Sequence, residues 1–72
     1  MELPEEIQKL TYSQGIAQLE QIVSAMQQPD CDIDRLAEYT TRALQLMQHC
    51  RAKLTATEEQ ITQALSQIST TL

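Results

Sequence analysis

The chain has 72 residues and a formal net charge of −5, with 5 Lys and Arg against 10 Asp and Glu. This length allows one small domain, spanning residues 1–72, near the lower limit for a self-sufficient core. The acidic balance disfavours direct binding to nucleic acid or to an anionic membrane, because Lys and Arg are the residues that bind phosphate groups. The 2 Cys and 1 His are too few for a disulfide framework or a structural zinc site.

Composition also bears on location and secondary structure. No apolar run approaches the roughly 18 residues of a membrane span, and residues 1–10 lack the apolar core of a secretory signal. We therefore expect a cytoplasmic protein without a membrane partner. The chain contains 1 Gly, 2 Pro, 2 Tyr and neither Phe nor Trp, beside many Gln, Leu and Ala. These proportions favour helices over strands, and an all-α fold is expected.

Residues 1–10 are compatible with a short helical lead-in or with a frayed terminus. A first long helix is predicted over about residues 11–28, opened by Thr11 and Gln14 at the spacing of a capping box. Gly15 inside this helix costs roughly 1 kcal/mol relative to Ala and would allow close approach of a neighbouring helix. The apolar residues of the helix follow one face, namely Tyr12, Ile16, Leu19, Ile22, Val23 and Met26.

Pro29 ends the first helix, and a turn is predicted over residues 29–32. Asp32 is a suitable N-cap for a second helix over about residues 33–70, which no Gly or Pro interrupts. Two columns of a heptad repeat follow this helix and form the a and d positions of a coiled coil. The first column reads Ile33, Thr40, Met47, Leu54, Ile61 and Ile68, and the second reads Leu36, Ala43, Cys50, Thr57, Ala64 and Thr71.

The two predicted helices differ greatly in length, and this difference indicates a partner. The first helix covers about 17 residues or roughly 25 Å, whereas the second covers about 39 residues or roughly 58 Å. An antiparallel hairpin folded at Pro29 pairs the first helix with only the first half of the second. The heptad columns beyond that half would face water, and we expect another chain to cover them in a helical bundle. The apolar residues in that part are Leu54, Ile61, Leu65, Ile68 and Leu72.

Catalytic chemistry is not apparent in the sequence. No nucleophile lies beside a base in a known motif, no Gly-rich phosphate loop is present, and no cofactor or metal site is predicted. His49 and Cys50 are adjacent, but neighbouring residues on a helix do not face one another. We expect a solvated or interface role for His49 and a buried position for Cys50. Two roles are possible for Glu58: it flanks the heptad columns, or it is a polar residue within them that selects the partner. The same two roles are possible for Arg51, which could pair with an acidic residue of a partner.

Several residues together resemble the small subunit of exodeoxyribonuclease VII. The first helix carries Leu10-Thr11-Tyr12 and then Leu19-Glu20-Gln21-Ile22-Val23, similar to an aromatic entry followed by L-E-x-I-V. A Pro-containing turn and Ile33-Asp34 follow, and the second helix matches the family at Cys50, Leu54, Glu58 and Ile61. The chain departs from the family in its turn, which lacks the usual Gly. It departs also at Thr40, where an aromatic is usual, and at Ala43, where Gly is common.

This resemblance implies a non-catalytic subunit that binds the large subunit of a bacterial nuclease and supports degradation of single-stranded DNA to oligonucleotides. Independently of the resemblance, we expect a homo-oligomer when the chain is isolated, because a chain this short without disulfides or metal needs oligomerisation or a partner. The residues expected to serve packing or partner contact are Leu19, Ile22, Val23, Leu44, Met47, Cys50, Leu54 and Ile61. The alternative is a self-associating helical-hairpin adaptor with no link to a nuclease. A direct nucleic-acid binder is a further alternative, but it needs a basic face, and the five Lys and Arg are scattered.

Overall fold

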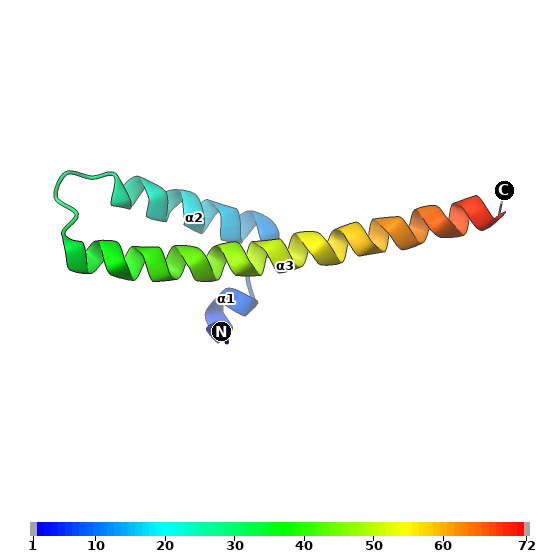
Figure 1. Cartoon of the computed structure of the whole chain (residues 1–72), viewed down its shortest axis with the longest axis horizontal. Coiled ribbons are helices and arrows are strands. Elements are labelled where there is room, and N and C mark those ends of the chain that lie inside the picture. Colours follow the sequence, from blue (N-terminus) through cyan, green and yellow to red (C-terminus); the bar gives the residue numbers. More distant parts are fainter. Residues whose placement is uncertain (1, 72) are drawn as a thin grey trace.

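In the computed structural model, the backbone of residues 2–71 and the side-chain surroundings of residues 2–68 are described. This part of the chain contains three helices and no strand: α1 (Glu5–Gln8), α2 (Tyr12–Met26) and α3 (Ile33–Thr71). Helices α2 and α3 form an antiparallel hairpin, and α3 continues far beyond α2 as a single arm (Figure 1). The molecule is therefore elongated, with extents of 60 × 23 × 15 Å.

Helix α2 begins at a complete capping box. The Gln14 backbone N–H donates to Thr11 Oγ1 at 3.1 Å, and the Thr11 N–H donates to Gln14 Oε1 at 2.9 Å. Two backbone donors that the helix itself leaves unpaired are thereby satisfied, as the sequence predicts. The helix ends at Met26, whereas the sequence predicted an end at about Gln28, two residues later.

The connection to α3 is a tight turn around Pro29. The Cys31 N–H donates to the Gln28 carbonyl at 3.1 Å, which places Pro29 at the second position of the turn, where its fixed φ is favourable. Asp32 then caps α3, because its carboxylate accepts from the Arg35 N–H at 2.8 Å. The chain direction thus reverses within residues 27–32.

The hairpin packs most closely near the start of α2. A Cβ atom placed on Gly15 would lie 2.7 Å from Cys50 Sγ, so only glycine fits at this position without displacement of its neighbour. Gly15 and Cys50 are both buried. The close approach predicted for Gly15 and the buried position predicted for Cys50 are therefore confirmed.

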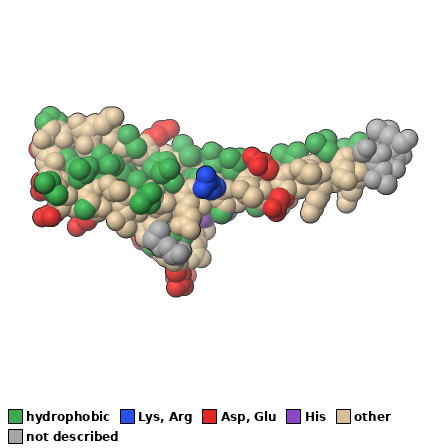
Figure 2. Space-filling view, in the orientation of Figure 1, with side chains coloured by type: hydrophobic (Ala, Val, Ile, Leu, Met, Phe, Trp, Pro, Cys, Tyr) green, Lys and Arg blue, Asp and Glu red, His purple; other side chains and the backbone are tan. Residues whose placement is uncertain are grey.

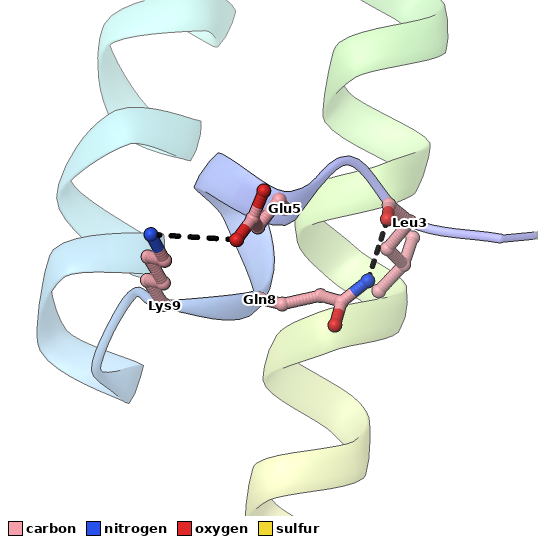
Figure 3. Close-up of polar contacts among 4 residues, drawn as sticks. All are labelled: Leu3, Glu5, Gln8 and Lys9. Carbon is pink, nitrogen blue, oxygen red and sulfur yellow. Dashed lines mark hydrogen bonds and ion pairs between the residues drawn. The ribbon is translucent and has the colours of Figure 1, made fainter.

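The N-terminal segment forms a short helix that packs on α3 beside the hairpin. Within it, the Gln8 side chain donates to the Leu3 carbonyl at 2.7 Å, and Lys9 lies 3.5 Å from Glu5 (Figure 3). Pro4 precedes the helix as its N-cap rather than lying in its first turn. Ile7 from this helix is fully buried, so α1 is a docked element and not a frayed terminus.

His49 is covered by this N-terminal segment, and the expectation of a solvated or interface side chain is wrong. Its side chain is 7% exposed, and Nε2 lies 2.8 Å from the Leu10 carbonyl oxygen. A carbonyl oxygen can only accept, so Nε2 carries the proton in this contact. His49 thus ties the α1–α2 connection to α3, a contact between residues far apart in the sequence.

Candidate partner-binding surface

One side of α3 carries the packing of the hairpin. Its least exposed residues recur at steps of four, three and four, and they are Tyr39, Ala43, Leu46 and Cys50. Beyond Cys50, the same spacing continues through Lys53, Thr57, Gln60 and Ala64, all of which are exposed. The hairpin side therefore loses its large apolar residues at the level where α2 begins.

A second side of α3 carries exposed large apolar residues from Ile33 to Ile68. We call it the open stripe, and it consists of Ile33, Leu44, Met47, Leu54, Ile61, Leu65 and Ile68. Their exposed fractions run from 47% at Leu54 to 83% at Ile33. Figure 2 shows apolar side chains extending from the hairpin onto the arm. Large apolar side chains exposed in one row along a helix are typical of an interaction site.

This arrangement corrects one expectation from the heptad columns. The first column was expected to pack against the first helix over the hairpin half, yet Met47 is 53% exposed. Leu46, which belongs to neither column, is fully buried instead. In the hairpin, α3 packs on α2 through second-column residues together with Tyr39 and Leu46. The first column therefore stays exposed to solvent. The spacing of Tyr39, Ala43, Leu46 and Cys50 is a sequence signal for this side, but the first heptad column is an equally regular signal for the other side.

Over the hairpin, the open stripe borders a groove between α2 and α3. Ile16 and Leu19 line it from α2, and Leu44, Met47, Gln48, Cys50 and Arg51 line it from α3. Large apolar residues on both walls and few charges are the usual features of a groove that receives an amphipathic helix. Beyond the groove every residue from Arg51 to Ile68 is exposed, so the arm presents its apolar residues on a bare helix.

Two charged residues interrupt the open stripe. Arg51 and Glu58 occupy the heptad position that follows the first column by four residues, the position shared by Leu44 and Leu65. Both side chains are exposed. They are the only charged residues in these two columns between Ile33 and Ile68. The stripe therefore combines an apolar surface with one cation and one anion, seven residues apart.

The eight residues expected at packing or partner contacts divide into two groups. Cys50 is buried and Leu19 and Ile22 are half-buried, all within the hairpin. The exposed group consists of Val23, Leu44, Met47, Leu54 and Ile61. Leu65 and Ile68 continue the exposed group toward the end of α3. Leu72 and the side chain of Thr71 lie outside the described residues.

Metal-binding clusters and membrane-spanning helices are absent from the described part of the chain. There, no group of three or more His, Cys, Asp or Glu side chains is arranged to hold a metal ion. Among the same residues, no helix combines the length and apolar character needed to cross a membrane. Two further hollows are shallow and lie on the surface of single helices, one around Glu58 and Glu59 and one around Tyr12 and Ile16.

Comparison with known proteins shows the family of the chain. The family described as exonuclease VII small subunit matches residues 12–63. The chain belongs to the exonuclease VII small subunit family. The exodeoxyribonuclease 7 small subunit of Sinorhizobium medicae is 35% identical over 57 residues, which cover 79% of this chain and 69% of the relative. That of Rhizobium meliloti is 36% identical over 56 residues, 78% of this chain and 68% of the relative.

No solved structure gives a significant match to the chain. The family match begins at Tyr12, so it covers α2, the turn and most of α3, and it leaves α1 outside. The alternative of an adaptor with no link to a nuclease is set aside by the family assignment.

Proposed function

We propose that this chain is the non-catalytic small subunit of an exodeoxyribonuclease VII and binds the large, catalytic subunit. Family membership supports the assignment, and the observation that carries the binding role is the open stripe, which extends past the hairpin to Ile68. In this role the chain supports the degradation of single-stranded DNA to oligonucleotides while the large subunit performs the hydrolysis.

The docking surface in this proposal is the groove over the hairpin together with the stripe on the arm. Each Leu, Ile or Met of the stripe that becomes fully buried contributes about 1.5–3 kcal/mol of transfer free energy. A helix of the large subunit suits this surface best, because apolar residues three and four apart match the spacing of the stripe. Of the eight predicted contact residues, we assign Leu44, Met47, Leu54 and Ile61 to this interface. Cys50, Leu19 and Ile22 support the hairpin beneath it.

The experiment is co-purification of the large subunit with this chain and with a Leu54→Asp, Ile61→Asp variant. Burying two carboxylates in an apolar interface should weaken the complex at least about 100-fold. Both positions are exposed on the arm, so the variant should keep its helix content by circular dichroism. The matched control is Thr57→Asp with Gln60→Asp, which adds the same charge to the polar side of the same arm.

Loss of binding in the stripe variant with retention in the control is the expected result. Equal binding by the two variants would refute the stripe as the docking surface. Degradation of single-stranded DNA by the large subunit should parallel binding. The activity should rise when the wild-type chain or the control variant is added, and it should not rise with the stripe variant. No rise with wild-type chain would count against the accessory role itself.

The chain is acidic, and we propose that it makes no direct contact with DNA in the complex. Its five cations include Arg42, which is already paired with Glu6 at 2.7 Å. A subunit of a DNA-degrading complex must be in the compartment that contains the DNA, so a cytoplasmic location is part of this proposal. Self-association of the isolated chain also belongs to it, since the open stripe is uncovered until the large subunit binds.

A further inference from the structure

The two charged residues of the open stripe are symmetric about its centre. Arg51 lies three residues before Leu54, and Glu58 lies four residues after it. The large apolar residues follow the same symmetry, because Met47 and Ile61 each lie seven residues from Leu54, and Leu44 and Leu65 lie ten and eleven residues away. A helix surface with this pattern is complementary to a second copy of itself that runs in the opposite direction.

The two parts of α3 are similar in length. Residues 33–50 form the hairpin half, and α3 continues from residue 51 to Thr71 as the arm. The two parts are about 27 Å and 32 Å long at 1.5 Å per residue. In an antiparallel pair, the arm of each copy therefore lies along the hairpin half of the other, over the groove lined by Ile16, Leu19, Leu44 and Met47.

We infer that the free chain forms an antiparallel homodimer through the open stripe, centred near Leu54, with Arg51 of each copy beside Glu58 of the other. The stripe of one copy then covers the stripe of its partner from Leu44 to Leu65. The pair has two-fold symmetry, so the same contact forms twice. A large subunit that binds the stripe competes with the second copy. The inference deepens the self-association proposed above by giving its surface, direction and register, and it holds or fails separately from binding of the large subunit, because it is tested on the chain alone.

Charge decides the direction of the pair. In a parallel pair in register, Arg51 would face Arg51 and Glu58 would face Glu58, and both contacts repel. In the antiparallel pair both contacts attract. Like charges placed opposite one another in an interface suppress the wrong arrangement, whereas opposite charges set direction and register.

The test is the dimer dissociation constant of the full-length chain, measured by sedimentation equilibrium. Arg51→Glu alone and Glu58→Arg alone each make both inter-chain contacts repulsive, and each should weaken the dimer at least about tenfold. The double variant R51E/E58R restores opposite charges and should return to within about threefold of wild type. The matched controls are Lys53→Glu and Glu59→Arg, which carry the same charge changes off the stripe and should have little effect.

Two results would overturn the inference. One is a wild-type chain that is still monomeric at about 100 µM, because a specific dimer interface should have a dissociation constant below that concentration. The other is a double variant that is as weak as the single variants, since that shows that the two residues do not face each other. Helix content by circular dichroism identifies any variant that fails to fold. Recovery of the dimer in the double variant would also show that the single variants are weak because of charge and not because of misfolding.

Direction is tested separately by cross-linking. Cys31 is replaced by Ser, Cys50 is left in place because it is 5% exposed, and Met47→Cys and Ile61→Cys are introduced in separate chains. When the two chains are mixed and mildly oxidised, the antiparallel pair gives mainly the mixed 47–61 disulfide. Predominance of 47–47 and 61–61 disulfides would show a parallel pair and overturn the proposed direction.

Discussion

At the scale of single residues, the contact between Gly15 and Cys50 sets how closely α2 approaches α3. The Cβ of any other residue at position 15 would meet Cys50 Sγ at 2.7 Å. Cys50 is buried, and its side chain is too short to move away without a change in its rotamer. A small residue on α2 therefore faces a small residue on α3, and the helices pack with little space between them.

Gly15→Ala is expected to lower the free energy of unfolding by about 1 kcal/mol. The overpacking cost of about 1–3 kcal/mol exceeds the helix-propensity gain of roughly 1 kcal/mol. In a Cys50→Ala background, where the sulfur is absent, the same change should instead be neutral or stabilising. Urea unfolding followed by circular dichroism at one fixed chain concentration measures both. An equal loss in the two backgrounds would contradict the contact.

Asp32 acts at the same scale, as the cap of the longest helix. Asp32→Ala removes the carboxylate that accepts from the Arg35 N–H and should cost about 1 kcal/mol in the free energy of unfolding. Asp30→Ala is the control, since it removes an exposed carboxylate of the same turn two residues earlier. Wild type and Asp30→Ala should have the same urea midpoint, and Asp32→Ala a lower one. Equal midpoints for all three proteins would show that the cap contributes nothing.

At the scale of elements, α1 and the residues that follow it form a small docked unit, and its described contacts with α3 include a buried side chain, an ion pair and a hydrogen bond. Ile7 is fully buried, Glu6 accepts from Arg42 at 2.7 Å, and the Leu10 carbonyl lies 2.8 Å from His49 Nε2. The ion pair contributes less than about 1 kcal/mol, because Glu6 is 69% exposed in its side chain and solvent screens it. The burial of Ile7 is therefore the main source of docking energy.

Ile7→Asp should detach α1 while α2 and α3 remain paired, because α2 packs on α3 through other residues. Hydrogen exchange is expected to accelerate at the backbone amides of residues 7–10, with those of α2 retaining their protection. Glu6→Gln, which removes only the ion pair, should leave α1 docked. Loss of protection throughout α2 in the Ile7→Asp variant would mean that α1 is required for the hairpin to fold.

At the scale of the whole molecule, elongation and charge determine what the chain can bind. An extended molecule of 60 Å with one long uncovered helix exposes apolar surface that a compact chain of this length would bury. The net charge of −5 adds a repulsive term toward phosphate. These two features favour a protein partner over nucleic acid.

The isolated chain is accordingly expected not to bind single-stranded DNA. Fluorescence anisotropy of a labelled oligonucleotide should stay constant up to about 100 µM chain even at low salt, where electrostatic binding is strongest. The same oligonucleotide with the large subunit present serves as the positive control. A salt-dependent rise with the chain alone would revive the direct nucleic-acid binder.

The sequence by itself determined the two long helices of this protein and their order, whereas it left α1 open. Capping at Thr11 and Asp32, the turn at Pro29, and the absence of Gly and Pro from residue 33 onward are local features, so local rules predict them. The unequal lengths of the two long helices, and hence the need for a partner, also follow from counting residues. The resemblance to the small subunit of exodeoxyribonuclease VII rested on local motifs and was confirmed by the family match.

Only the tertiary structure decided which side of α3 faces α2. Apolar residues occupy more than one side of the hairpin half of α3, so periodicity alone assigns Met47 and Leu46 to the interior equally well. The contact of Gly15 with Cys50 fixes the rotation of α3, which buries Leu46 and leaves Met47 exposed. The burial of His49 likewise depends on the contact with Leu10, which lies 39 residues earlier in the chain. Local sequence patterns do not predict contacts over this separation.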